Sequence, residues 1–411
     1  MVNATETMAG PRRASDARVI GLISAAHFVS HLHMLVLPPL FLFIQRDYGL
    51  SFAQLGLILA SFNIVSAVLQ APAGFVVDRW GAGRLLIGGL LLGSAALAAA
   101  SLTPSYVGLI LCFALAGLAN TIYHPSDYSI LSHTIAGKRM GQAFSIHNFA
   151  GLLGTAAAPA SMLLVAQVWG WHGALLGAGL VGAIVALVLI VQREALAVAP
   201  HHAARPRAAA EGSHTGWRLL LSAPILRNLM FFLLVALVGG GINGFSIVAL
   251  GALYGTPIET ANVALSSYLF MSALGVLVGG YIADRTRHHT RVAAVGFAVS
   301  GAVILTVGIA HLATVPLVLL MGVGGLLYGI IQPSRDMIVR SVTPPGSFGK
   351  VFGFVSTGFN IGGVVAPLAY GWMMDQGAPR AVFLVVAGFT FLTLLTVATT
   401  PQRAPRAVPA E

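Results

Sequence analysis

Long, continuous runs of apolar residues recur along the whole chain and restrict its fold more than any other feature. The run at 85–102, LLIGGLLLGSAALAAASL, is close to the roughly 20 residues that a helix needs to cross a bilayer. Only 8% of the 411 residues are charged, against roughly 25% in an average soluble protein. This composition excludes a soluble enzyme, a nucleic-acid-binding module and a disordered scaffold, and it predicts an all-α membrane protein.

The apolar runs predict twelve transmembrane helices, if each span with its loop takes about 30–35 residues. Ser51 and Gln54 have the spacing of a capping box and mark the start of the second span. The predicted spans are 18–44, 53–76, 84–103, 106–131, 142–167, 172–192, 226–250, 261–282, 291–312, 315–338, 350–374 and 381–399.

The distribution of basic residues predicts the orientation of the chain. With the N-terminus in the cytoplasm, all 22 Lys and Arg residues except Arg46 and Arg380 fall on the cytoplasmic side, as the positive-inside rule requires. Both termini are therefore expected in the cytoplasm, and the chain in the inner (plasma) membrane. The net charge of +10 then reflects cytoplasmic loops and not a nucleic-acid partner.

The two halves of the chain share a set of matched positions. Gly74-x3-Asp78-Arg79 recurs as Gly280-x3-Asp284-Arg285, and Pro125-Ser126 recurs as Pro333-Ser334. Gly141, Phe144, Gly154 and Pro159 recur as Gly349, Phe352, Gly362 and Pro367. The longest polar stretch lies between the halves and is typical of a flexible linker. A duplicated six-helix unit indicates a secondary transporter with its site between the two halves.

Three segments resemble the major facilitator superfamily, and the resemblance covers 18–399. The segment 74-GFVVDRWGAGR-84 is similar to the superfamily's G-x3-D-R-x-G-x-R loop, whereas its copy 280-GYIADRTRHHTR-291 has Arg287 where the first has Gly81. The segments 27-HFVSHLHMLVLPPL-40 and 123-YHPSDYS-129 look most like the fosmidomycin-resistance-type exporters, although His31 stands where an acidic residue is expected.

This resemblance implies two pseudo-symmetric six-helix bundles. The expected parts are an N-terminal cytoplasmic tail (1–17), an N-terminal bundle (18–192), a cytoplasmic linker (193–225), a C-terminal bundle (226–399) and a C-terminal cytoplasmic tail (400–411).

The resemblance also implies a gating role for the loop signature. Asp78 would contact the start of span eleven near Lys350, and Asp284 would contact the start of span five. At both places a carboxylate can face the positive end of a helix dipole. The alternative is a basic loop that only fixes the topology. The expected gating residues are Gly74, Asp78, Arg79, Gly81, Arg84, Asp284 and Arg285.

His27 and His31 are four residues apart in span one and therefore share a helix face. His31 lies ~20 Å along the axis from Arg18, near the middle of the membrane, where ionisable groups are costly and usually functional. Because histidine titrates near neutral pH, we expect proton coupling or substrate binding. The alternative is two neutral imidazoles that bond to backbone or Ser groups. His-x3-His can also ligate zinc, but no Asp, Glu or Cys accompanies the pair within its span, so no metal is expected.

Further polar residues are expected near a central cavity, which the resemblance places between spans one, four, seven and ten. His124 and Asp127 are three residues apart and can pair. For each residue the alternative is a local hydrogen bond between helices. The expected substrate-binding or proton-coupling residues are His27, His31, Asn120, Tyr123, His124, Asp127, His147, Asn148, Asn243, Tyr328, Gln332, Arg335 and Asn360.

The charges at depth favour a neutral or anionic substrate. None of the acidic residues falls in the middle third of a predicted span, and the titratable groups at depth are histidines. The run 151-GLLGTAAAP-159 permits close helix contact and resembles the antiporter pattern, which favours export. We therefore expect proton-coupled export of a small neutral or anionic compound, a drug or a metabolite, by alternating access.

The alternatives are proton-coupled uptake of an organic anion and, from another class of protein, an intramembrane metalloenzyme that uses His27 and His31, with His124 as a further candidate ligand. The chain has no P-loop sequence, so we expect no direct drive by ATP. We expect no enzymatic activity and no cofactor. The expected partners are the small-molecule substrate, protons and the lipid bilayer, without nucleic acid, and such folds can work as monomers.

Overall fold

The computed structural model describes residues 15–135, 139–196, 217–286, 288–342 and 348–398. Most of both predicted tails and the centre of the predicted linker lie outside these residues. All regular elements in the described ranges are helices, which confirms the predicted all-α fold.

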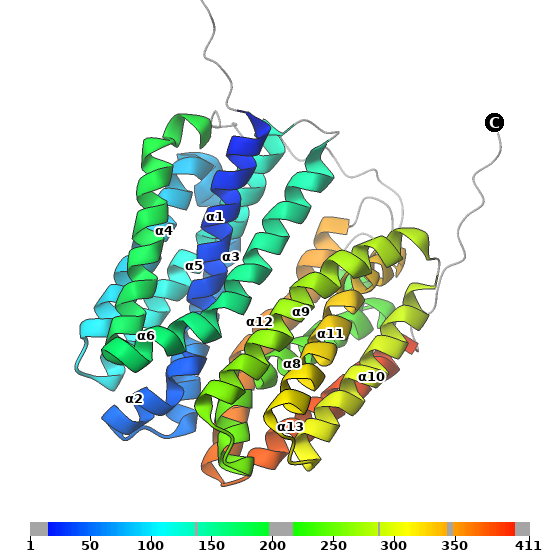
Figure 1. Cartoon of the computed structure of the whole chain (residues 1–411). Coiled ribbons are helices and arrows are strands. Elements are labelled where there is room, and N and C mark those ends of the chain that lie inside the picture. The colour runs from blue at the N-terminus through cyan, green and yellow to red at the C-terminus, as the bar shows by residue number, and fades with distance from the viewer. Residues whose placement is uncertain (1–14, 136–138, 197–216, 287, 343–347, 399–411) are drawn as a thin grey trace, which may run out of the picture.

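The helices form two groups that stand side by side (Figure 1). The first bundle contains α1 (Asp16–Met34), η1 (Pro38–Leu40), α2 (Phe41–Tyr48), α3 (Phe52–Trp80), α4 (Ala82–Leu102), α5 (Tyr106–Thr134), α6 (Met140–Val191) and η3 (Arg193–Leu196). The second contains α7 (Trp217–Leu220), α8 (Ala223–Tyr254), α9 (Ile258–Arg285), α10 (His289–Ile309), α11 (Thr314–Val342), α12 (Phe348–Asp375) and α13 (Pro379–Ala398).

One predicted span is interrupted in the structure, and two others lie within one long helical element. The span at 18–44 is interrupted after Met34, because Pro38 and Pro39 cannot continue an α-helix. The spans at 142–167 and 172–192 are both parts of α6, whose 52 residues would measure about 78 Å if straight. Gly170 has φ 68° and ψ 175°, outside the helical region, and divides α6 into two helices.

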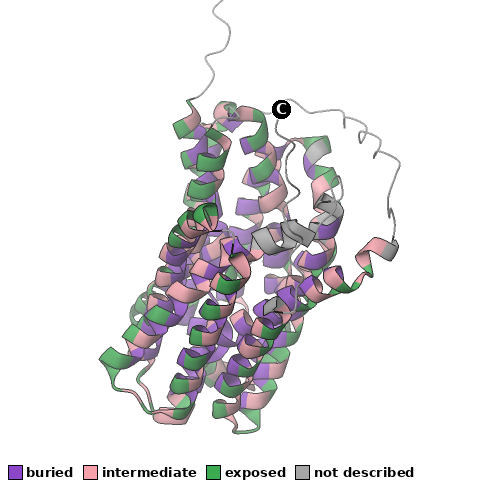
Figure 2. Ribbon diagram, turned by 90° about the vertical axis from the view of Figure 1, so that its right-hand side faces the viewer, coloured by how far each residue is buried: buried purple, intermediate pink, exposed green. Residues whose placement is uncertain are grey.

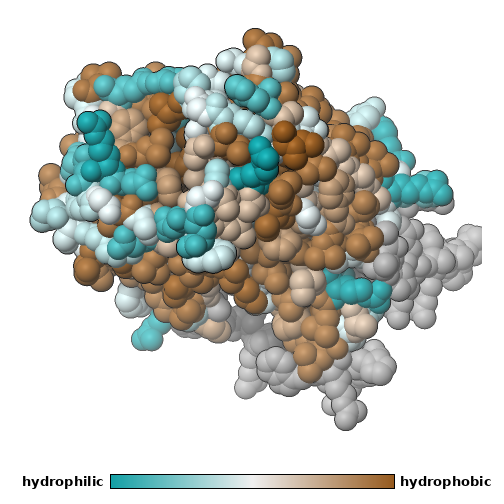
Figure 3. Space-filling model, turned by 90° about the horizontal axis from the view of Figure 1, so that it is seen from below, coloured by the Kyte–Doolittle hydropathy of each residue, from teal (hydrophilic) through white to brown (hydrophobic). Residues whose placement is uncertain are grey.

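By length and composition, ten helical segments of the described chain can cross a membrane, with α6 counted once. Many residues on the outside of the helices are exposed (Figure 2), among them large apolar ones such as Val107, Leu164 and Leu319. Figure 3 views the end away from the chain termini, where hydrophilic residues gather over part of the surface and hydrophobic residues surround them. The chain is therefore a multi-pass membrane protein.

Two signals in the sequence, the capping box at Ser51 and the glycine at position 81, correspond to helix ends in the structure. The predicted capping box of α3 is confirmed, because Ser51 Oγ accepts from the Gln54 N–H at 3.2 Å and Gln54 Oε1 accepts from the Ser51 N–H at 2.8 Å. Gly81 alone separates α3 from α4, and its φ of 93° is a value that favours glycine. The loop signature therefore has a glycine at this position for a backbone reason.

The two bundles meet in the half of the molecule that we call the acidic end, where Asp47, Glu259 and Asp375 lie. The rings of Phe41 and Phe245 are 5.5 Å apart, and Gln167 Nε2 donates to Glu259 Oε1 at 2.9 Å. The opposite, basic end is where α1 and α8 begin and α3 and α9 end. It carries Arg18, Arg79, Arg139, Arg227 and Arg285.

Candidate functional site

Five ionisable side chains meet in the interior of the first bundle, and we call them the histidine cluster. They come from three helices that are not consecutive: α1, α5 and the first part of α6. Helical spacings of four and three residues place those of α1 and of α5 each on one face. The members are His27, His31, His124, Asp127 and His147.

The imidazole rings of the cluster contact one another directly. The rings of His27 and His147 are stacked, with centroids 3.8 Å apart and planes 24° apart. The His31 ring lies 4.5 Å from His27 and the His124 ring 5.2 Å from it, both edge to face. His27 therefore lies at the centre of the cluster.

Asp127 is completely buried, and its carboxylate faces His27 and His147. Its Oδ2 lies 3.4 Å from His27 Nδ1 and 3.7 Å from His147 Nε2, longer than the usual hydrogen bond. Within the described part of the chain neither carboxylate oxygen accepts a hydrogen bond. A buried carboxylate without hydrogen bonds is costly, so a proton on this group or on a neighbouring imidazole stabilises the cluster.

Two predictions about Asp127 need correction. Its partners within ion-pair distance are His27 and His147, and not His124, which the spacing predicted. No acidic residue falls in the middle third of a predicted span, so the sequence predicted no carboxylate beside His27, whereas helix packing brings Asp127 against it. Position along one helix does not fix which residue of another helix lies at the same depth.

Small residues of α6 allow α1 to approach closely enough to form the cluster. A Cβ added at Gly151 would lie 2.5 Å from His27 Cδ2 and 3.0 Å from His31 Cδ2. One at Gly154 would clash with the carbonyl of Phe28. Thr155 Oγ1 lies 3.1 Å from His31 Nδ1, at hydrogen-bond distance. The close helix contact that the 151–159 run predicted is thus the contact between α6 and α1 at the histidine cluster.

Sequence reasoning missed three residues around the cluster. Gly151 was not singled out within its run, and Thr155 was not considered as a partner. Tyr128 lies between two members, with its ring 5.8 Å from that of His124 and 5.9 Å from that of His147. The i, i+4 spacing from His124 was the available signal for Tyr128.

The imidazoles also have a spacing that can accommodate a metal ion. Ligand atoms of His27, His124 and His147 all lie within 4.8 Å of one another. Zinc–nitrogen bonds measure about 2.0–2.1 Å, so these side chains would have to draw together around an ion. The sequence pattern suggested His27, His31 and His124 for such a site, and the structure brings His147 together with His27 and His124 instead of His31.

The other predicted residues of the first bundle lie outside the cluster. Asn120 Nδ2 donates to Ser66 Oγ at 3.3 Å, which is a contact between α5 and α3. The Tyr123 hydroxyl donates to the carbonyl of Gly89 in α4 at 3.1 Å. Asn148 is exposed. For Asn120 and Tyr123 the structure thus shows the helix–helix hydrogen bonds that the alternative predicted.

The remaining predicted residues belong to the second bundle. Arg335 of α11 places its guanidinium carbon 5.2 Å from the ring centroid of Phe232 and 5.6 Å from that of Phe359, an arrangement typical of cation–π contact. Three partly buried residues lie on three helices of this bundle: Asn243 on α8, Gln332 on α11 and Asn360 on α12. The Tyr328 ring lies 6.0 Å from that of Tyr268.

The gating residues occupy the ends of α3 and α9 and the start of α4. Arg79, Arg84 and Asp284 are exposed, and nothing lies within 4 Å of a Cβ added at Gly74. Arg285 covers the ring of Tyr281 at 3.5 Å, and Asp284 makes no ion pair with any described residue. The side chains of Asp78 and Lys350 lie outside the described residues. The latch therefore stays a prediction.

Comparison with known proteins places this architecture in a family. The family model of the Major Facilitator Superfamily matches residues 23–257 and 229–411. The chain is 24% identical over 398 residues to the fosmidomycin resistance protein of Escherichia coli, covering 92% of each chain. It is 22% identical over 383 residues to the hexuronate transporter of Bacillus subtilis, covering 86% of this chain and 87% of that one.

Solved structures show the same fold at lower identity. A bacterial homologue of the human lysosomal transporter Spinster, in an inward-facing and occupied conformation, superposes with a TM-score of 0.76 at 15% identity and covers 95% of this chain and 98% of that one. The family match spans nearly the whole chain, and the helices are arranged as in a solved transporter. The chain therefore belongs to the Major Facilitator Superfamily.

Proposed function

We propose that this protein exports a small neutral or anionic compound, a drug or a metabolite, in exchange for protons, by alternating access of its two bundles. The observation that carries the proposal is Asp127, a buried carboxylate that faces two imidazoles and accepts no hydrogen bond among the described residues. Ionisable groups at membrane depth commonly form proton relays. Similarity to a fosmidomycin resistance protein supports export.

The cluster can carry a proton because one proton changes its net charge from −1 to zero. With four neutral imidazoles, the Asp127 carboxylate is an uncompensated buried charge, which is costly. A proton from outside neutralises it or forms an ion pair with His27 or His147, and this favours the inward-facing state. The substrate leaves on the outside before that step. Proton release to the cytoplasm then resets the exporter.

The test measures proton movement in inside-out vesicles that hold a respiration-driven proton gradient, read with a quenched pH dye. The compounds are fosmidomycin, small phosphonates and small carboxylates. A substrate should cause dequenching in the native protein, and Asp127→Asn and His31→Gln should lower the rate at least tenfold. His33→Gln is the matched control, because His33 is buried in the same helix but bonds to the Ala178 carbonyl, outside the cluster.

Equal dequenching by the native protein and Asp127→Asn would contradict the role of the cluster. Absence of dequenching with every compound, together with entry of a labelled compound into right-side-out cells, would contradict export. Stoichiometric zinc in the purified protein would support the metalloenzyme alternative at His27, His124 and His147.

A second candidate, uptake of an organic anion with protons, is favoured by one observation from the comparisons. A relative that covers most of this chain is a hexuronate transporter. Arg335 in the second bundle supplies a positive charge suited to a carboxylate. Accumulation of a labelled sugar acid in energised cells, lost in Arg335→Gln, would support this candidate over export.

A further inference from the structure

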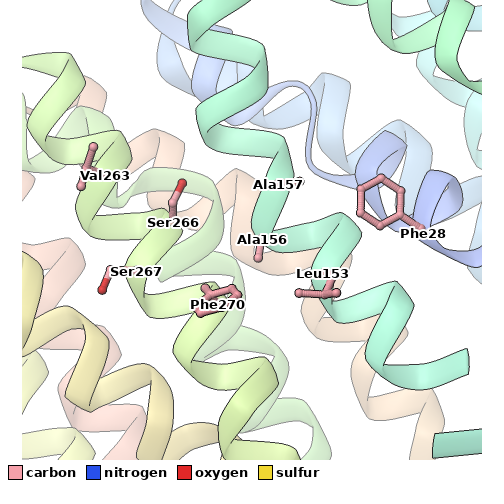
Figure 4. A pocket seen from close by; sticks show the side chains of 8 residues that line it. All are labelled: Phe28, Leu153, Ala156, Ala157, Val263, Ser266, Ser267 and Phe270. Carbon is pink, nitrogen blue, oxygen red and sulfur yellow. The ribbon is translucent and has the colours of Figure 1, made fainter. Parts of the chain in front are cut away.

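A pocket of about 520 Å³ lies between the two bundles (Figure 4), and none of the five members of the histidine cluster lines it. Phe28 of α1 and Ala156 and Ala157 of α6 form its wall on the first bundle. Val263 and Phe270 of α9 are on the second-bundle side. Its volume is within the range of about 300–1,000 Å³ that small-molecule sites occupy.

The lining of this pocket is almost entirely apolar. Two serines supply its polar groups, and no charged side chain lines it. Ser267 Oγ donates to the Val318 carbonyl at 3.1 Å, whereas Ser266 Oγ is buried and has no hydrogen-bond partner among the described residues. Val263 and Phe270 are 52% and 47% exposed. The pocket therefore suits an alkyl or aryl group, and its lining has no positive charge to pair with a phosphonate or carboxylate.

The pocket and the histidine cluster share the contact between α1 and α6. Phe28 follows His27 in α1, and Ala156 follows Thr155, which lies at hydrogen-bond distance from His31. An occupant of the pocket would touch this helix pair and α9 together. Because alternating access moves one bundle against the other, such an occupant interacts differently with the two states, as any ligand must in order to shift them.

We infer that this pocket binds the apolar chain of the transported compound, so that the substrate is an amphiphile with a polar head and an alkyl or aryl chain. The inference rests on the proposed function and specifies its substrate class. A membrane lipid offers the same alkyl chemistry. The position of the pocket between the two bundles, beside the helices that carry the cluster, favours the transported compound.

The test measures binding of n-alkylphosphonates and n-alkyl alcohols, from methyl to octyl, to the full chain in lipid nanodiscs. Calorimetry gives each affinity after subtraction of empty nanodiscs. Affinity should rise about fourfold for each added methylene until the chain fills the pocket. Phe270→Ala and the pocket-filling Ala157→Phe should each weaken octylphosphonate binding about tenfold and leave methylphosphonate unchanged. Leu277→Ala is the matched control, because Leu277 lies two turns further along α9 with the same 47% exposure.

Equal affinity at all chain lengths in both series would overturn the inference. A rise in affinity with alkyl-chain length that persists unchanged in Phe270→Ala and Ala157→Phe would also overturn the inference, because the alkyl chain would then bind elsewhere or in the bilayer. Methylphosphonate-driven proton movement without any chain-length dependence would overturn this inference and leave the proposed function standing. The expected chain-length dependence without proton movement by any of the phosphonates would support the pocket and count against the proposed function.

Discussion

Gly151 is one of the small residues of α6 that let α1 come close enough to form the histidine cluster. The imidazoles of His27 and His31 occupy the space that a Cβ of residue 151 would take. This close approach lets His147, four residues earlier in α6, stack on His27. The stack, in turn, leaves Asp127 facing both rings.

We predict that Gly151→Ala disrupts the cluster. The added methyl would lie 2.5 Å from His27 Cδ2, so α1 or the imidazoles must shift, at a cost of about 1–3 kcal/mol. Thermal unfolding of the purified protein should occur at a lower temperature than in the native protein. The rate of substrate-driven proton movement should also be lower. Gly88→Ala is the control, since nothing lies within 4 Å of its added Cβ. Native-like transport by Gly151→Ala would show that the ring stack is dispensable.

The sequence predicted the members of the cluster better than their contacts. His27 and His31 share a face as their spacing predicted, and His124, Asp127 and His147 were candidates from the start. His124 and Asp127 interact electrostatically, as their spacing predicted, but the side chains within ion-pair distance of Asp127 are His27 and His147. Spacing fixes which residues of one helix share a face, but not the neighbour that this face meets.

At the level of helices, the N-terminus of α3 is capped from both bundles. Ser51, in the first bundle, accepts from the N–H of Gln54. Asp375, at the end of α12 in the second bundle, accepts from the N–H groups of Phe52 and Ala53 at 2.7 and 2.8 Å. A helix leaves its first N–H groups without partners, and a carboxylate there also faces the positive end of the dipole. Asp375 thus joins the bundles at the acidic end.

We predict that Asp375→Asn weakens closure of the acidic end. Loss of the charge should cost about 1 kcal/mol, roughly a fivefold change in the ratio of closed to open molecules. Cys112 is the single cysteine of the chain, so the experiment uses a Cys112→Ser background. Spin labels at Leu102→Cys, at the end of α4, and at Val315→Cys, at the start of α11, report the distance between the bundles at this end. The longer-distance population should grow in Asp375→Asn.

Glu259→Gln is the control for this experiment. Its contact with Gln167 is exposed, and the substituted amide can still accept a hydrogen bond, so the distance distribution should change little. Identical distributions for Asp375→Asn and the native side chain would show that the shared cap does not hold the bundles together.

For the whole molecule, the charge asymmetry between the two ends predicts its orientation in the membrane. Helix ends at the basic end carry Arg18, Arg79, Arg139 and Arg285, whereas the acidic end joins the bundles through Glu259 and Asp375. The positive-inside rule places the basic end in the cytoplasm. The bundles are packed together at the acidic end, so in this orientation the structure would be closed toward the outside.

Labelling with a membrane-impermeant maleimide tests this orientation in a Cys112→Ser background. Trp80 and Leu102 are matched sites, because both are exposed apolar residues at helix ends, at the basic and the acidic end respectively. Leu102→Cys should react in intact cells, and Trp80→Cys only after the cells are permeabilised. The reverse pattern would place the N-terminus outside and invert the proposed direction of proton flow.

The all-helical membrane fold, the breaks between most spans, the internal repeat and the family resemblance could all be read from the sequence. These depend on the lengths of apolar runs and on local signals such as Ser51 with Gln54 or the glycine at 81, which act over a few residues. Three features became visible only in the folded chain: Asp127 faces His27, Asp375 caps α3, and a pocket opens between Phe28 and Phe270. Such contacts depend on the rotation and tilt of each helix, which are set by packing between segments far apart in the chain.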